Sequence, residues 1–257
     1  MKHHAFLCAS LLFATLCVAP LSSFGDDAKK EKPAYDPFAE SEADDAKYEW
    51  TYLFDGKTLD NWIDLKDGGD EAVKVKDGAL RLGMGPSTTS IRFDSEKSGI
   101  EIPTTDYEIE YIAKRYDGTD FFAAMTFPIG DAYVTFVNGG WGGCVAGISN
   151  VDDMDASENS TSSFYNFKTG EWYRFRVQVS AKTVRVWVND EAIVDYPIVG
   201  HTLRTRFEVE RCKPLGFASW VSTGLIKKIR LRRLSAEEVA EMDKRAEEHA
   251  KFFNFSE

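Results

Sequence analysis

Short runs in which apolar and polar residues alternate make up most of the chain after about residue 48. In residues 107–114, aromatic and aliphatic side chains alternate with Glu108 and Glu110. A period of two is typical of a β-strand with one buried face. The dipeptides Asp77-Gly78 and Asn189-Asp190 favour tight turns, and each lies between two such runs. They therefore predict β-hairpins.

The predicted strands follow one another at intervals of roughly ten residues, with no helical pattern between them. Their ranges are Trp50–Phe54, Val73–Leu82 (a hairpin), Tyr107–Lys114, Phe121–Phe127, Ala132–Val137, Trp172–Val179, Thr183–Val188, Ala192–Tyr196, Phe207–Arg211, Leu215–Trp220 and Ile226–Leu234. This spacing predicts an all-β fold in which antiparallel sheets pack as a sandwich or jelly roll. Ser235 is expected to cap a C-terminal helix within residues 235–257.

The two ends of the chain differ from this β-rich region. Residues 1–25 combine a short basic start with the apolar run Ala5–Leu21, which predicts a secretory signal peptide too short to span a membrane. Residues 26–47 are rich in charge and lack an apolar period, so we expect a disordered leader. The domain then covers residues 48–234. The protein is expected to be exported, periplasmic or extracellular.

Charge and cysteine content narrow the class of ligand. The net charge is −11, and loss of the signal peptide removes only Lys2, leaving about −12. Such a protein is repelled by nucleic acid, which favours a carbohydrate, a small ligand or a protein partner. Cys144 and Cys212 are the cysteines of the mature chain. They either form one disulfide or stay as buried thiols.

The segment Val137–Thr161 combines a candidate strand end, glycines around Trp141, and a run of acids and amides. Glycines allow a ligand to approach the backbone, and an indole offers an apolar face for stacking. The segment, with Asn138 near its start, is therefore a candidate wall of a site for a polar ligand. The alternative is a β-bulge followed by a solvated loop.

Four tryptophans lie in or beside predicted strands and are candidates for a sugar-stacking platform: Trp141, Trp172, Trp187 and Trp220. The alternative for each of them is a place in the core. Arg174 shares a strand face with Trp172. Because a buried arginine needs a charged partner, this pairing favours a polar groove in which Arg174 positions the ligand.

Carboxylates are the candidate catalytic groups. Glu208 and Glu210, at i and i+2 of a predicted strand, would project from one face about 7 Å apart, which suits an acid and base pair acting on a glycosidic bond. Glu158 is a further candidate. The alternative for all of them is an exposed, solvated glutamate.

No cofactor is firmly implied by the sequence. Asp153, Asp155 and Ser157 imitate the start of a calcium loop, but the glycine and the distal glutamate of an EF-hand are missing. A calcium site of another kind would use Asp152, Asp153, Asp155 or Glu158. A Ser-His-Asp arrangement would have to include His201, because His249 lies on the predicted terminal helix.

The segment Leu53–Trp62, LFDGKTLDNW, with the hairpin at Lys76-Asp77-Gly78, resembles the opening of the three-keto-disaccharide hydrolase domain family. This family was formerly a domain of unknown function and is often labelled family 16 glycoside hydrolase-like. Later matches are Asp106–Tyr111, Gly170–Tyr173, Val184–Asp190 and Ile229–Leu231. The resemblance covers about residues 48–234, and the whole chain looks like a planctomycete-type branch. It implies a concanavalin A-like jelly roll from a bacterium that degrades polysaccharides or glycosides.

The chain departs from the family at the expected pocket. Ala218–Val221 stands where the family has a Gln-x-His-Gly segment, and Tyr133–Phe136 stands where it has Tyr-Glu-x-Gln. No catalytic role is therefore carried over by position. The E-x-D-x-E type motif of true family 16 enzymes is also absent from the sequence.

Two hypotheses follow from the sequence. The first is an exported hydrolase of glycosidic or 3-keto-glycoside bonds, with Glu210 or Glu158 as acid or base, Arg174 as positioning group and Trp141 or Trp220 as platform. The second is a noncatalytic glycan-binding or envelope interaction module, which the loss of the family's polar residues favours.

Overall fold

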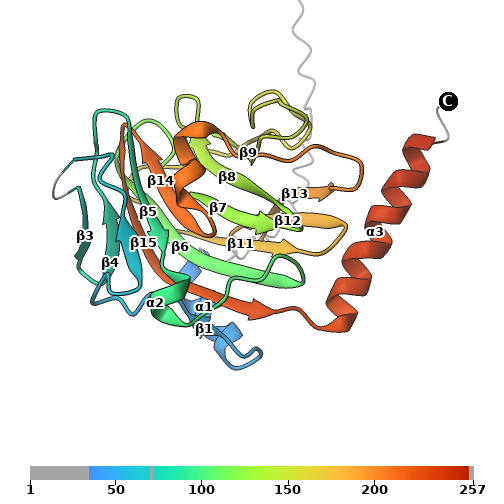
Figure 1. The fold of residues 1–257 in the computed structure, drawn as a ribbon, viewed down its shortest axis with the longest axis horizontal. Helices are drawn as coiled ribbons and strands as arrows, with labels where there is room; N and C mark the ends of the chain where they lie inside the picture. The colour runs from blue at the N-terminus through green and yellow to red at the C-terminus, as the bar shows by residue number, and fades with distance from the viewer. Residues whose placement is uncertain (1–34, 70–71, 255–257) are drawn as a thin grey trace, which may run out of the picture. The chain divides into compact units, whose positions relative to one another are not determined.

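Two antiparallel β-sheets lie face to face, with helices around them (Figure 1). The computed structural model describes residues 35–69 and 72–254. The predicted signal peptide and residues 26–34 of the predicted leader lie outside the described residues. The architecture is the jelly-roll sandwich that the alternating pattern predicts.

Sheet A has the strand order β13-β12-β11-β6-β15-β4-β3, and β1 also pairs with β15. Its strands are β1 (Thr51–Tyr52), β3 (Val73–Lys76), β4 (Ala79–Leu82), β6 (Tyr107–Gly118), β11 (Tyr173–Val179), β12 (Thr183–Val188), β13 (Glu191–Pro197) and β15 (Ser222–Arg233).

Sheet B has the strand order β10-β9-β8-β7-β14-β5-β2. Its strands are β2 (Trp62–Asp64), β5 (Thr88–Phe93), β7 (Ala124–Ile129), β8 (Ala132–Gly140), β9 (Val145–Ser149), β10 (Ser163–Phe164) and β14 (Gly216–Trp220).

The core lies between the sheets and is rich in aromatic side chains. Tyr111 of β6 stacks on Phe175 of β11 with ring centroids 4.9 Å apart, and Phe217 of β14 meets Tyr111 edge-on at the same distance. These three residues are fully buried. Rings from both sheets therefore interlock, which fixes how the sheets lie on each other.

Helices cover parts of this sandwich. They are α1 (Pro37–Asp45), the short α2 (Ser95–Ser98) and α3 (Ala236–Asn254), with a 3₁₀ helix, η1 (Phe207–Cys212), between β13 and β14. The Glu238 backbone N–H donates to the Ser235 side chain, and the Ser235 N–H donates to the Glu238 carboxylate. This reciprocal capping box starts the predicted C-terminal helix. In the described residues, no helix is long and apolar enough to cross a membrane.

The predicted strand Phe207–Arg211 is wrong, because these residues form η1. Their alternation of apolar and charged residues imitates a strand. In the structure Phe207 is 83% exposed, whereas Val209 and Cys212 are buried, so burial follows a period of three. That period is the one a 3₁₀ helix presents to its support.

The predicted disorder of the leader is wrong for Pro37–Asp45, which form α1 on the outer face of sheet A. Asp36 caps the helix by accepting from two backbone N–H groups, and proline occupies its first turn. A composition dominated by charge gives no apolar signal for this helix. Its buried contacts are ionic instead.

Candidate functional site

A cavity of about 220 Å³ opens on the outer face of sheet B, beneath η1 and beside Trp141. Strand residues form its floor, because alternate side chains of β7, β8, β9 and β14 point away from the core. The lining residues are Asp120, Phe121, Ala124, Thr135, Val137, Trp141, Ser149, Arg206, Glu208, Val209 and Trp220. The floor is largely apolar, and the charged side chains come from the loop before β7 and from the η1 segment.

The 3₁₀ helix η1 forms one wall of the cavity. Val209 and Cys212 are buried in a small cluster with Leu65 and Ala218, which attaches η1 to sheet B. Burial raises the pKa of the Cys212 thiol to about 12. Cys144 and Cys212 are both free thiols, so the predicted alternative of a disulfide is not realised.

The opposite wall is the turn that carries Trp141. It needs backbone conformations that glycine tolerates, with φ of +77° at Gly139 and +108° at Gly143, and Trp141 itself has a φ of +49°. Arg115 reaches under this turn and donates to the carbonyl oxygen of Gly143 over 3.2 Å. The indole is 45% exposed beside the cavity, so it is available for stacking.

Charged groups from η1 stand at the cavity. The Arg206 guanidinium donates to both carboxylate oxygens of Glu208, over 3.1 and 2.9 Å, and it also pairs with Asp155. The hydrogen bond from Arg206 lowers the pKa of Glu208, although partial burial opposes it. Glu208 is therefore ionised at neutral pH and suits a base rather than a general acid.

Asp120 is a second carboxylate in the cavity, and the sequence did not single it out. Its side chain accepts from the backbone N–H of Phe121 at 2.8 Å and faces the N–H of Gly142 at 3.4 Å. The backbone thus orients one carboxylate beside Trp141. No spacing motif marks this aspartate, because its neighbours in the cavity come from distant parts of the chain.

Three of the predicted site residues, Trp141, Trp220 and Glu208, come together in the cavity. Glu210 does not, because it leaves η1 in another direction, pairs with Lys213 and Thr205, and has a side chain 55% exposed. In a 3₁₀ helix, residues two apart point to different sides, whereas in a strand they share one. The predicted Glu208 and Glu210 pair on one face is therefore wrong. Glu158 is exposed and does not line the cavity.

Asn138 is not a surface ligand group in this structure. Its side chain accepts from the Ala123 N–H at 3.0 Å and donates to the Ala123 carbonyl at 2.8 Å and to the Tyr111 hydroxyl at 3.1 Å. The residue is fully buried. A register shift between Asn138 and Gly140 interrupts the pairing of β8 with β9 at this point. Asn138 therefore fastens β8 to the chain before β7, and its predicted place in a ligand site is wrong.

The predicted groove around Trp172, Arg174 and Trp187 is also wrong, because these residues lie on the outer face of sheet A. There Phe38 of α1 packs edge-on against Trp172, and the Arg176 guanidinium lies 5.0 Å from the Trp187 ring centroid. The cavity floor is formed by strands of sheet B instead. Trp172, Arg174 and Trp187 therefore contribute to the attachment of α1 and to the packing on sheet A.

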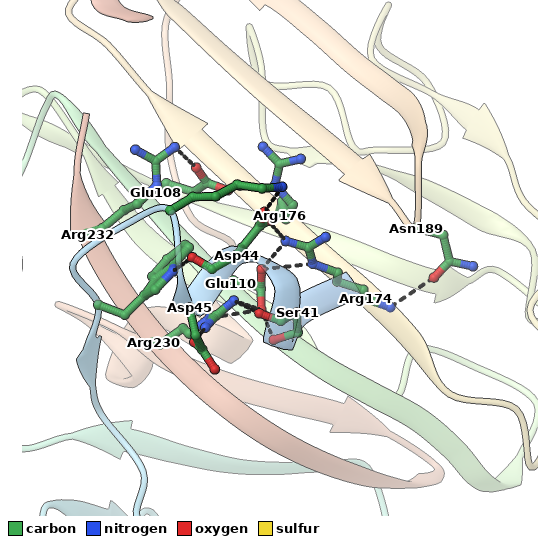
Figure 2. Close-up of polar contacts among 12 residues, drawn as sticks. Ser41, Asp44, Asp45, Glu108, Glu110, Arg174, Arg176, Asn189, Arg230 and Arg232 are labelled. Carbon is green, nitrogen blue, oxygen red and sulfur yellow. Dashed lines mark hydrogen bonds and ion pairs between the residues drawn. The ribbon is translucent and has the colours of Figure 1, made fainter. Parts of the chain in front are cut away.

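Arg174 belongs to a buried ion network under α1 (Figure 2). Its Nε donates to Glu110 over 2.8 Å, its Nη2 pairs with Asp44 of α1, and Arg230 donates to Glu110 over 2.9 Å from the other side. Glu110 and Arg230 have no measurable exposure. The need for partners was predicted correctly, but strand β6 and helix α1 of the same chain supply them.

The acidic side chains after β9 pair separately with a histidine and two arginines and do not converge on one point. Asp152 bonds His201 at 2.7 Å, Asp153 pairs with Arg204 at 3.2 Å, and Asp155 pairs with Arg206. Within residues 35–69 and 72–254, no group of three His, Cys, Asp or Glu side chains could hold a metal ion.

Comparisons with known proteins agree with this fold. The model of the 3-keto-alpha-glucoside-1,2-lyase-like domain family matches residues 49–232 of the chain. Among the curated proteins, none matches the chain in sequence.

The solved structures that resemble this chain are distant from it in sequence. Crh5 transglycosylase in complex with NAG has 13% identity and a TM-score of 0.50, with 73% of this chain and 84% of that chain covered. A Parabacteroides distasonis protein assigned to the glycosyl hydrolases has 15% identity and a TM-score of 0.47, with 76% and 97% covered. The carbohydrate binding module CBM66 from Bacillus subtilis has 10% identity and a TM-score of 0.38, with 70% and 92% covered. At 13% identity the similarity to the Crh5 transglycosylase shows the fold alone.

Proposed function

Since the chain belongs to the family of 3-keto-alpha-glucoside-1,2-lyase-like domains, we propose that it breaks a glycosidic or 3-keto-glycoside bond in the cavity beside Trp141 and Trp220. The family makes it a carbohydrate-active, glycosyl hydrolase-like domain. The reaction and the site residues are the proposal.

One observation carries the proposal: two indoles and two carboxylates meet in a single cavity although they lie far apart in the sequence. Trp141 and Trp220 offer apolar faces on which the C–H face of a sugar ring can stack. Asp120 and Glu208 supply the ionisable groups that such chemistry needs. The cavity of about 220 Å³ suits one ring, with the rest of the ligand outside.

The electrostatics of Glu208 favour a substrate with a ketone at C3. Its bond to Arg206 keeps the carboxylate ionised but also makes it a weak base. A weak base can remove only an activated hydrogen. A ketone at C3 provides this activation, because it acidifies the hydrogen on C2. Transfer of this proton to Glu208 lets the C2–H electron pair form a C1=C2 bond as the C1–O bond breaks, and the leaving oxygen takes a proton from water. The hydroxide so formed adds to C1 while Glu208 returns its proton to C2, which regenerates the carboxylate and completes net hydrolysis.

The alternative is a noncatalytic glycan-binding module. It is favoured by the apolar lining from Ala124, Val137 and Val209, since a stacking site needs few charged groups. The two functions differ in whether the bond breaks. The purified protein should therefore be incubated with a panel of glycosides and matched 3-keto-glycosides, with and without Ca²⁺. Cleavage of any 3-keto-glycoside supports the enzyme, and saturable binding without cleavage supports the module.

We further propose that the protein is exported, on the basis of the signal-like residues 1–25. The expected mature protein begins near residue 26. N-terminal sequencing of the protein recovered from the periplasm or medium of an expressing bacterium tests this. Recovery of the intact N-terminus in the cytoplasm would contradict it.

A further inference from the structure

A second and larger cavity, of about 560 Å³, lies at the edge of sheet A. Three segments enclose it: Tyr48–Thr51 at the start of β1, the loop that contains Ile100 and Pro103, and Leu231–Arg233 at the end of β15. It shares no lining residue with the cavity beneath η1. Its volume is in the range of small-molecule sites in proteins.

Arg232 lines this cavity and has an unused hydrogen-bond donor. The residue is 4% exposed, and its terminal nitrogens are held by Glu108 of β6 and Glu238 of α3. Its buried Nε–H has no acceptor in the described part of the chain. The guanidinium is therefore fixed in the cavity wall by the two glutamates and forms a base on which the neighbouring aromatic rings pack.

Aromatic rings beside Arg232 are held in fixed positions. The Arg232 guanidinium lies 3.8 Å from the ring centroid of Tyr48, and that of Arg230 lies 4.1 Å from Trp50. The two rings meet edge-on at 6.2 Å. Tyr48 remains 36% exposed. The cavity thus combines a fixed aromatic surface with polar groups, as sites for sugars require.

The charges around the cavity favour an uncharged ligand. Glu49 and Glu101 line it, and Arg233 is the cation beside Arg232. The charge of Arg232 is already balanced by Glu108 and Glu238. A carboxylate or phosphate ligand would therefore find no excess of positive charge, whereas sugar hydroxyls can donate to Glu49 or Glu101 and accept from Arg233.

We propose that this cavity is a second saccharide-binding site, which takes an uncharged sugar ring or short oligosaccharide. It lies on the opposite sheet from the cavity beneath η1 and does not depend on cleavage there. A site of this kind holds a chain of sugars against the protein through a second contact.

Titration calorimetry with maltose, cellobiose, laminaribiose and xylobiose tests the proposal, in the variant Trp141→Ala so that the first cavity does not contribute. At least one sugar is expected to bind. Adding Tyr48→Ala should weaken its binding at least tenfold, and adding Glu101→Gln should weaken it several-fold. Tyr116→Ala is the matched control, because this tyrosine is 56% exposed and lines neither cavity.

Circular dichroism melting of the Tyr48→Ala protein separates loss of binding from loss of fold, and Glu101→Gln changes an exposed side chain. The proposal is overturned if none of the four sugars binds Trp141→Ala protein, or if the Glu101→Gln and Tyr48→Ala proteins bind as tightly as the control. Tighter binding of galacturonic acid than of every neutral sugar would overturn the proposal that the ligand is uncharged.

Discussion

The Arg115 guanidinium donates a 3.2 Å hydrogen bond to the carbonyl oxygen of Gly143, two residues after Trp141. It also donates to the Phe167 carbonyl and to the Thr169 hydroxyl. In the described residues no carboxylate pairs with this buried arginine, and burial lowers its pKa. The hydrogen bonds from the buried guanidinium fix the positions of the carbonyl groups that accept them. Arg115 is therefore the support of the Trp141 turn.

Gly143→Ala and Gly142→Ala form a matched pair that tests this support. A Cβ on Gly143 would lie 3.0 Å from both Nη1 of Arg115 and the carbonyl oxygen of Thr119, whereas a Cβ on Gly142 would meet no atom within 4 Å. Both glycines have positive φ. Gly142→Ala should cost about 1 kcal/mol in the free energy of unfolding, from backbone strain alone. Gly143→Ala should cost about 1–3 kcal/mol more and weaken sugar binding. Equal losses in urea unfolding would show that the close packing of Arg115 and Thr119 against Gly143 is unimportant.

Asn138→Ala should destabilise the fold without removing a ligand contact. The change leaves the N–H of Ala123 without its buried partner, at about 1–3 kcal/mol, whereas the Ala123 carbonyl still accepts from the Tyr111 hydroxyl at 3.2 Å. Urea unfolding measures the loss, and calorimetry measures sugar binding for each folded molecule. If the variant has normal stability but has lost sugar binding, Asn138 contributes to the ligand site after all.

Asp44 should make the attachment of α1 depend on pH. Burial alone would raise the pKa of this carboxyl, but hydrogen bonds from Lys47 and Arg174 outweigh burial and place the pKa below its ordinary value of 3.8. A group whose pKa is lower in the folded than in the unfolded state stabilises the protein at pH values above its unfolded pKa. That contribution is lost as the pH falls through the folded pKa. Asp44→Asn should therefore cost about 2 kcal/mol near pH 7 and progressively less below about pH 4.

Urea unfolding at a series of pH values checks this dependence. Glu42→Gln in the same helix is the control, because its carboxylate is 68% exposed and pairs with Lys228 at 3.5 Å. Such surface pairs contribute less than about 1 kcal/mol. A loss for Asp44→Asn that is the same at all pH values would mean that its ionisation plays no part.

The sandwich could be predicted because its main strands have one apolar and one polar face. Tyr107, Ile109 and Tyr111 of β6 are fully buried between the sheets, as their alternation predicts. The turn at Asp77-Gly78 has positive φ at both residues, which a two-residue hairpin turn requires. Local patterns of this kind depend only on neighbours in the sequence, so they can be recognised without a structure.

The site was only partly predictable because its parts meet through tertiary packing. Trp141 and Trp220 were identified by their indoles, but Asp120 carries no local signal. Arg174 was misassigned because its partner Asp44 lies far away in a charged segment without an apolar pattern. Glu210 was misassigned because the alternation in residues 207–211 fits a strand as well as a 3₁₀ helix. Sequence periodicity cannot distinguish these two for so short a segment.

Glu208 is proposed to act as the base in the cavity beneath η1. Glu208→Gln removes one of the two carboxylates of the cavity, whereas Glu210→Gln makes the same change two residues later, on a side chain outside the cavity. The rate of cleavage of a 3-keto-glycoside under saturating conditions should fall at least 100-fold in Glu208→Gln, the usual scale for loss of a general base. In Glu210→Gln it should stay within about twofold of the unmodified protein. Equal activity of the two variants, or a larger loss in Glu210→Gln, would show that Glu208 is not the base.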